Sequence, residues 1–243
     1  MAYKELLARS FKYGMMFGKD IRPGNAVGIS VTNIDDIVLA VKKAYIDMSP
    51  RTFRKEGSRP LDPEMKAALF EALAEKYAEY MQHGAVDFED WHHKLCCFFI
   101  RELEKILADA GKDPADATYG KAQKIINMTF KYLYCFDDAA EYAERFEPCH
   151  MAIDSYILNW VKEWYPAEVN KPSKQSGKKT RIPFPYWSNM TYTSGDKLKP
   201  QYLELQREIR KWVEKEYHMP CIEAEFIIWY DERSKLSKKA QNH

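Results

Sequence analysis

Three lysines lie on one side of a single candidate helix, where one amine can influence another. Lys121, Lys124 and Lys131 fall within about 80° of one another around an ideal helix. An amine is a nucleophile only when it is neutral, and free lysine has a pKa of about 10.4. A reactive lysine therefore needs desolvation or a neighbouring positive charge. Lys121 or Lys131 would supply such a charge and disfavour the protonated form of Lys124.

An aspartate stands at the start of a second candidate helix. Asp154 precedes Ile157, Val161 and Trp164, which recur at helical spacing. This pattern predicts that Asp154 is an N-cap, where backbone N–H groups keep a carboxylate ionised. Such a carboxylate is suited to stabilising a cation or to taking a proton from an amine. The alternative is that Asp154 is only a cap and that the lysines are solvated.

Histidines, thiols and other acids offer further chemistry, and each has a simpler structural explanation. His92 and Cys96 are four residues apart on one helix. No second ligand pair of zinc spacing accompanies them, so we expect no metal site. His150 either lines a pocket or is a loop histidine with a hydrogen-bond partner. Glu223 and Glu225 flank an apolar run, and a structural partner is expected for each.

The longest polar segment, residues 166–198, is rich in proline and in basic residues. Its basic part, which contains no acid, holds Lys171, Lys174, Lys178, Lys179 and Arg181, and the aromatic residues Tyr186 and Trp187 follow. The net charge of the chain is only +1, so attraction for nucleic acid requires a local basic patch of this kind. The segment is therefore a candidate element for binding a nucleic-acid strand, because it combines basic side chains with aromatic rings that can stack on bases. A solvated loop whose aromatic rings pack onto the core is the equal alternative.

Helical patterns account for most of the chain. Asp62-Pro63 and Asp87 are typical of helix starts. Further helices are expected at residues 121–135, 154–165 and 199–217. The run from Ile222 to Trp229 fits a strand or a buried helix equally well. The predicted fold class is therefore predominantly all-α.

A glycine stands between two of the helical segments. Asp113-Pro114 is typical of the cap of a short helical turn, and this turn would end at Gly120. The predicted layout is a short helix, a glycine turn, a helix with Lys124 near its start, a loop, and then Asp154 opening a new helix.

Length and composition suit one compact helical unit spanning residues 1–243. Hydrophobic residues make up 46% of the chain and charged residues 30%, as in ordinary globular proteins. The sequence has no run of about 18 apolar residues, which a membrane-spanning helix would need, and its first residues lack the apolar core of a signal peptide. The five cysteines are odd in number. They predict reduced thiols and a cytoplasmic location rather than a disulfide framework.

The layout resembles the helix-hairpin-helix DNA glycosylases. Bifunctional members of that superfamily carry a lysine early in the second hairpin helix and an aspartate after a short apolar segment such as Pro-Val-Asp. Lys124 and Asp154 occupy these places, with Met151-Ala152-Ile153 before the aspartate. The spacing and the absence of a Gly-x-Gly hairpin are most similar to the archaeal 8-oxoguanine glycosylase branch. The resemblance covers about residues 86–165, with Ala152 in place of proline.

The resemblance implies a two-lobed helical fold with a helix-hairpin-helix core at about residues 101–165. It also implies a DNA glycosylase with lyase capability that needs no cofactor. In such an enzyme Lys124 would attack the sugar C1′ and form a Schiff base, and Asp154 would support the cationic transition state.

Binding residues follow from the same resemblance. Main-chain N–H groups near Gly120 would hold the DNA backbone, together with the basic side chains of Lys121, Lys178, Lys179 and Arg181. The target nucleotide would be flipped into a pocket between the two helical halves. The candidate lining residues of this pocket are His150, Tyr186 and Trp187.

The expected partner is duplex DNA with a modified base, which is oxidised, alkylated or a bulky modification of the phage type. No obligate protein partner and no membrane are expected. The competing hypothesis is a non-enzymatic helical module from a phage or a defence locus that binds nucleic acid or protein. It predicts an exposed Lys124 and an Asp154 that only caps. A third hypothesis is an RNA-binding module that uses residues 171–187.

Overall fold

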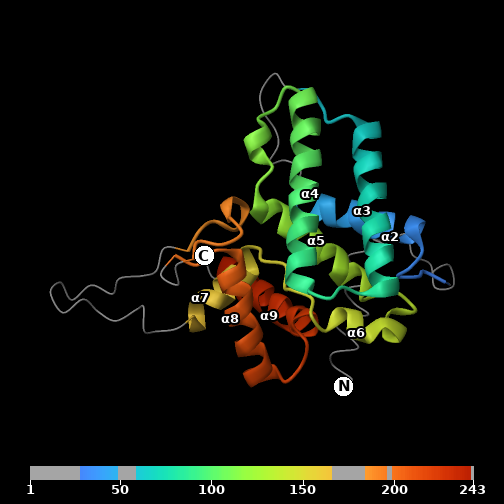
Figure 1. Cartoon of the computed structure of the whole chain (residues 1–243). Coiled ribbons are helices and arrows are strands. Elements are labelled where there is room, and N and C mark those ends of the chain that lie inside the picture. The colour runs from blue at the N-terminus through green and yellow to red at the C-terminus, as the bar shows by residue number, and fades with distance from the viewer. Residues whose placement is uncertain (1–27, 49–58, 166–183, 196–198, 242–243) are drawn as a thin grey trace.

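The computed structural model describes residues 28–48, 59–165, 184–195 and 199–241, and these residues form helices and loops without a strand (Figure 1). The eight α-helices in this part are α2 (Ile34–Asp47), α3 (Pro63–His83), α4 (Phe88–Asp109), α5 (Tyr119–Leu133), α6 (Ala143–Phe146), α7 (Ser155–Trp164), α8 (Tyr202–Tyr217) and α9 (Cys221–Gln241). Short 3-10 helices are η4 (Pro114–Asp116), η5 (Ala139–Tyr142) and η7 (Trp187–Asn189). The predicted all-α class is confirmed for the described residues. None of their helices is long and apolar enough to cross a membrane.

Side-chain caps explain where the principal helices begin. The Asp62 carboxylate accepts hydrogen bonds from two N–H groups in the first turn of α3, and Pro63 occupies the first helical position. The Asp87 carboxylate caps α4 by accepting from one N–H group, that of Asp90, and the Asp154 carboxylate caps α7 by accepting from two. All three caps confirm the starts that the sequence predicts.

The ambiguous run from Ile222 to Trp229 lies in helix α9 and not in a strand. Its buried residues Ile222, Glu225 and Phe226 are followed by the half-buried Trp229, and this is helical spacing. The helix continues for several turns beyond the apolar run, so the run is only the buried end of a longer element.

Gly120 lies inside a helix and not in the expected turn. It is the second residue of α5, whose N-cap is Thr118, so the expected glycine turn before the lysine helix is absent. The chain instead passes from η4 through Thr118 directly into α5.

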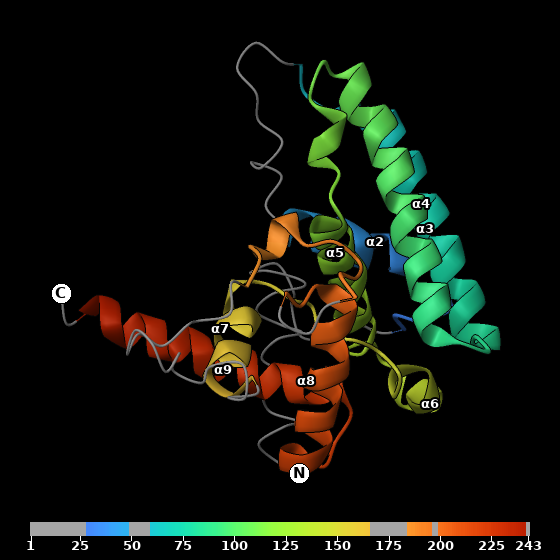
Figure 2. The same ribbon diagram turned by 60° about the vertical axis from the view of Figure 1, so that its left-hand side comes forward.

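The helices form two groups with α5 between them. Helices α3 and α4 stand side by side as a long pair, and α2 and α5 pack against this pair (Figure 1). Helices α7, α8 and α9 form the second group, which Figure 2 shows on the other side of α5. Buried apolar residues from both groups belong to one continuous core. Nearly every residue of α5 is buried, so side chains of this helix can reach both groups.

Candidate active site

Lys124 lies on the second turn of α5 and is half-buried. Its Nζ lies 4.7 Å from the centroid of the Trp187 ring. Among the described residues, the amine forms no ion pair and no hydrogen bond. Lys124 therefore presents an amine that the rest of the described structure does not use, covered on one side by an indole ring.

Asp154 is 8% exposed and caps α7 with only one of its carboxylate oxygens. Oδ1 accepts hydrogen bonds from the N–H groups of Tyr156 at 2.9 Å and Ile157 at 3.0 Å. Within the described ranges Oδ2 accepts no hydrogen bond. The side chain is thus fixed through one oxygen while the other remains available.

Residues 149–154, here called the buried linker, run through the core to Asp154 and are all buried. Side chains from α5, α8 and α9 form hydrogen bonds with the backbone of the linker, as the backbone of a neighbouring strand would. Gln206 of α8 exchanges hydrogen bonds with the N–H and the carbonyl of Met151. Gln123 of α5 does the same with Ile153, donating at 2.7 Å and accepting at 3.2 Å.

The Gln123–Ile153 pairing joins the residues that directly precede the two candidate catalytic residues. Lys124 directly follows Gln123, and Asp154 directly follows Ile153. The two hydrogen bonds therefore hold the second turn of α5 against the start of α7. That Lys124 and Asp154 belong to one site stays a prediction of the sequence.

A cleft opens beside these residues, between α7 and the segment at residues 184–187. Its volume is about 350 Å³. One wall is a face of α7 and carries Ser155, Asn159 and Lys162. The other wall includes Tyr186 and Trp187, so the ring that covers Lys124 also lines the cleft. Tyr186 is 81% exposed, as a ring at the mouth of a binding cleft would be.

The segment from Trp187 to Met190 packs against the start of α5. The Gly120 N–H donates to the Met190 carbonyl at 3.0 Å, and the Thr118 hydroxyl donates to the Ser188 carbonyl. A Cβ on Gly120 would lie 1.9 Å from the Trp187 carbonyl oxygen. Glycine is required here by this close approach. Of the main-chain N–H groups near Gly120 that were expected to hold the DNA backbone, that of Gly120 itself already has a partner.

The other two lysines of α5, Lys121 and Lys131, each interact with another residue of the protein. Lys121 is buried, and its amine donates to the Asp116 carbonyl at 2.8 Å and lies 3.8 Å from the Asp116 carboxylate. Burial lowers the pKa of Lys121, although Asp116 opposes that change. This placement corrects the expectation that Lys121 reaches for phosphates at the surface. Lys131 forms a buried ion pair with Glu225 at 2.9 Å.

His150 belongs to a buried polar network and not to the cleft. Its Nδ1 and the Tyr202 hydroxyl are hydrogen-bonded at 2.7 Å. The same hydroxyl accepts from Asn127 Nδ2 at 2.9 Å and lies 3.2 Å from His92 Nε2. Burial lowers the pKa of His92 to about 4 and the pKa of His150 well below its ordinary value. The expectation that His150 lines a base pocket is corrected, since both rings are neutral core residues.

The basic residues Lys178, Lys179 and Arg181 lie outside the described residues, so their predicted contact with DNA stays a prediction. No group of three or more His, Cys, Asp or Glu side chains in the described ranges is arranged to hold a metal ion. His92 instead pairs with Asn127, its Nε2 lying 2.9 Å from the amide oxygen.

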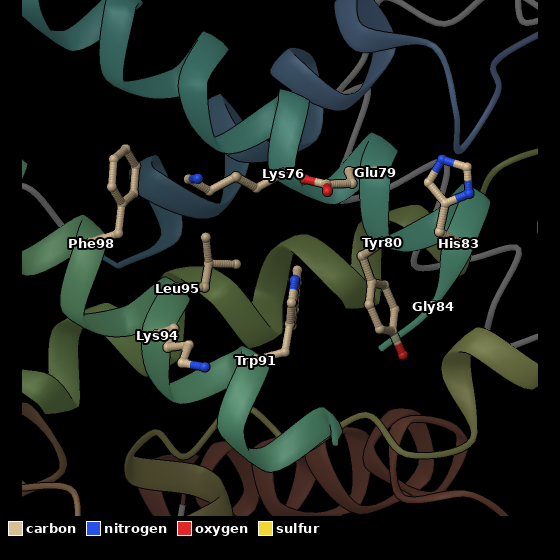
Figure 3. Close-up of a pocket in the computed structure, with 9 residues that line it drawn as sticks. All are labelled: Lys76, Glu79, Tyr80, His83, Gly84, Trp91, Lys94, Leu95 and Phe98. Carbon is tan, nitrogen blue, oxygen red and sulfur yellow. The ribbon is translucent and has the colours of Figure 1, made fainter. Parts of the chain in front are cut away.

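A second hollow, of about 280 Å³, lies between α3 and α4, away from the cleft. Figure 3 shows Lys76 of α3 and Lys94 of α4 on opposite sides of it, with Trp91 and Phe98 among its lining residues. The Lys76 amine lies 4.8 Å from the centre of the Phe98 ring. Glu79 is the acidic residue of the lining. Rings and two lysines therefore meet in this groove as well.

The residues that fix the linker were missed by sequence reasoning. Gln123, Gln206 and Glu225 come from three helices, and their common target is a segment far from two of them in sequence. The one available signal is the occurrence of polar residues at core positions of amphipathic helices, since such residues need a buried partner.

Comparison of the chain with protein families, with curated proteins and with solved structures finds no match.

Proposed function

We propose that this protein is a DNA glycosylase with lyase activity, acting on duplex DNA that carries a modified base. One observation carries the proposal. The Gln123–Ile153 pairing joins the residues that directly precede Lys124 and Asp154, and Trp187, whose ring covers the Lys124 amine, lines the cleft that begins at Ser155. The two groups of helices around α5 would correspond to the two lobes of a helix-hairpin-helix glycosylase.

The chemistry assigns one role to each residue. The neutral Lys124 amine attacks the sugar C1′, and the bond from C1′ to the base nitrogen breaks with its electrons leaving on the base, which takes up a proton. One proton of the amine passes to the departing base. The sugar ring then opens as the C1′–O4′ bond breaks, O4′ takes up the second proton, and an imine joins lysine and sugar. Asp154 stabilises the positive charge that develops on the sugar, or accepts a proton from the amine.

The cleft between α7 and residues 184–187 supplies a place for the flipped base. Trp187 and Tyr186 would stack on the base, because offset or tilted contacts between flat rings are favourable. Ser155 and Asn159 on the facing wall offer hydrogen-bond partners for the base edge. A pocket with an aromatic wall and a few polar groups is typical of small-ligand recognition.

The direct test is a screen of the purified protein against duplexes that each carry one modified base, followed by reduction with borohydride. A covalent protein–DNA adduct with one of these duplexes supports both the glycosylase and the lyase assignment. Base release without an adduct would keep the glycosylase and remove the lysine mechanism. Absence of both with every duplex would leave the binding module as the better account.

The groove between α3 and α4 is the observation that favours this second function. Rings with lysines beside them are what proteins use to hold single-stranded nucleic acid. If the groove binds a strand, Lys76→Gln and Lys94→Gln should each lower the salt dependence of binding by about one unit of slope. In a glycosylase that does not use the groove, the same variants should leave the borohydride adduct unchanged.

A further inference from the structure

Lys131 and Glu225 form an ion pair in which both side chains are only 1% exposed. In the described part of the chain, no other ion pair is buried on both sides. Desolvating two charges costs more than most such pairs return, and well-packed apolar residues often stabilise a core equally well. The pair therefore calls for a role besides stability.

The second oxygen of the Glu225 carboxylate has a separate task. Oε1 faces the Lys131 amine, while Oε2 accepts a hydrogen bond from the Ala152 N–H at 2.9 Å. Ala152 lies in the buried linker, two residues before Asp154. Burial raises the pKa of Glu225, and the Lys131 ammonium opposes this change. Lys131 thus favours the ionised carboxylate, the stronger acceptor for the Ala152 N–H.

Helix α9 also fixes the lysine. The Lys131 Nζ lies 5.0 Å from the centroid of the Phe226 ring and 5.5 Å from that of the Trp229 ring. Such contacts between an ammonium and ring faces are favourable. With its ammonium held in this way, Lys131 offers Glu225 one defined direction for the ion pair.

We infer that Glu225, oriented by Lys131, is a positioning residue that sets the buried linker and, through it, the place of the Asp154 carboxylate at the start of α7. The inference rests on the proposed function for its catalytic meaning, because that function gives Asp154 its role. Its structural content is independent: α9 controls the place of the α7 cap through the Ala152 N–H. Gln123 and Gln206 hold the linker on either side, at Ile153 and Met151.

Hydrogen exchange tests the positioning without any catalytic assay. In Glu225→Gln, an amide oxygen that accepts from Ala152 would place its NH₂ group against the Lys131 ammonium, so one contact must be lost. We expect exchange at Ala152, Tyr156 and Ile157 to accelerate at least tenfold relative to the core amides of α3. The matched control is Leu73→Ala, because Leu73 is fully buried in α3, outside the buried linker. It should accelerate α7 and α3 amides alike.

A rescue variant separates the hydrogen bond from the charge. In Lys131→Met/Glu225→Gln no cation opposes the amide, so its oxygen can accept from Ala152 and slow exchange should return. If exchange at Tyr156 and Ile157 in Glu225→Gln rises no more than in α3, the positioning role is wrong.

The activity arm uses the same proteins on the duplex found by the screen. Glu225→Gln should lower kcat for base release at least tenfold with KM unchanged, and the rescue variant should recover most of it. An unchanged kcat in the folded Glu225→Gln protein would overturn the catalytic meaning of the pair. A wild-type protein that releases no base overturns the proposed function, while the exchange data still decide the positioning.

Discussion

Gln123 and Ile153 exchange two hydrogen bonds between a helix and the buried linker, at 2.7 Å and 3.2 Å. A side-chain amide here supplies both contacts that a neighbouring strand would give to one residue. Because Lys124 and Asp154 directly follow these two residues, the register of the pairing fixes the backbone of α5 beside Lys124 relative to the backbone beside Asp154. A change at Gln123 should therefore affect both the fold and the site.

Gln123→Leu should leave the N–H and the carbonyl of Ile153 buried without a partner. Each unpaired group costs about 1–3 kcal/mol, so we expect the free energy of unfolding to fall by about 2–6 kcal/mol. Urea unfolding followed by circular dichroism measures this loss. Gln82→Leu is the control, since Gln82 is exposed on α3, and it should change stability by no more than about 0.5 kcal/mol. Equal effects of the two substitutions would remove the structural role of Gln123.

Stability should fall with acidification below pH 6.5, because His92 is buried in its neutral form. Burial lowers the pKa of His92 to about 4, whereas in the unfolded chain it titrates near 6.5. Between pH 6.5 and pH 4 the His92 ring binds a proton in the unfolded chain but not in the folded chain. The contribution of His92 to the free energy of unfolding is therefore fully present above pH 6.5 and is lost as the pH falls toward 4. The loss from His92 is about 3 kcal/mol.

The contribution of His92 can be isolated from that of the carboxyl groups by comparison with His92→Phe. The variant keeps a ring beside Tyr202, on which His92 is stacked at 5.4 Å, but it has no proton to bind. Urea midpoints of both proteins at pH 7, 5.5 and 4.5 should converge as the pH falls. Parallel pH dependence of the two proteins would show that His92 titrates normally.

The local parts of the fold are predictable from the sequence. Asp62, Asp87 and Asp154 cap helices at the predicted places because N-cap chemistry acts within three residues. Gly120 was misplaced for a physical reason. Glycine permits turns, but it also permits close approach, and the carbonyl that approaches it belongs to Trp187, 67 positions further along the chain.

The candidate site is only half predictable for the same reason. Lys124 and Asp154 could be paired by their resemblance to a family, and the local cap at Asp154 could be foreseen. The partners of Lys121 and Lys131 could not, since sequence spacing places all three lysines on one side of α5. Only tertiary contacts distinguish the amine under Trp187 from the two that are turned to Asp116 and Glu225.

Asp154→Asn should separate capping from catalysis. Asparagine is as good an N-cap as aspartate, so the free energy of unfolding should change by about 1 kcal/mol or less. Base release should fall by about 10²-fold or more, because the charge that supports the cationic sugar is gone. Asp62→Asn in the cap of α3 is the matched control and should release base at the wild-type rate. Full activity of folded Asp154→Asn would leave the residue as a cap alone.

The nucleophile can be identified at one atom. If the Lys124 amine forms the imine with the sugar, borohydride reduces that imine to a permanent crosslink, which migrates slowly on a denaturing gel. Lys124→Gln should bind the duplex but give no crosslink, because glutamine is similar in reach and lacks the amine. Peptide mapping of the wild-type adduct should place the sugar on Lys124.

Lys121→Gln is the decisive comparison, because burial lowers the pKa of Lys121 on the same helix and makes it the competing amine. We expect this variant to crosslink at or below the wild-type rate, with the sugar still on Lys124, since the Lys121 amine donates to Asp116 and is buried. If Lys121→Gln abolishes the adduct and Lys124→Gln retains it, the nucleophile is the buried amine, and the assignment to Lys124 is wrong. If Lys124→Gln releases base at the wild-type rate without a crosslink, water is the nucleophile and Asp154 remains as the residue that supports the cationic sugar.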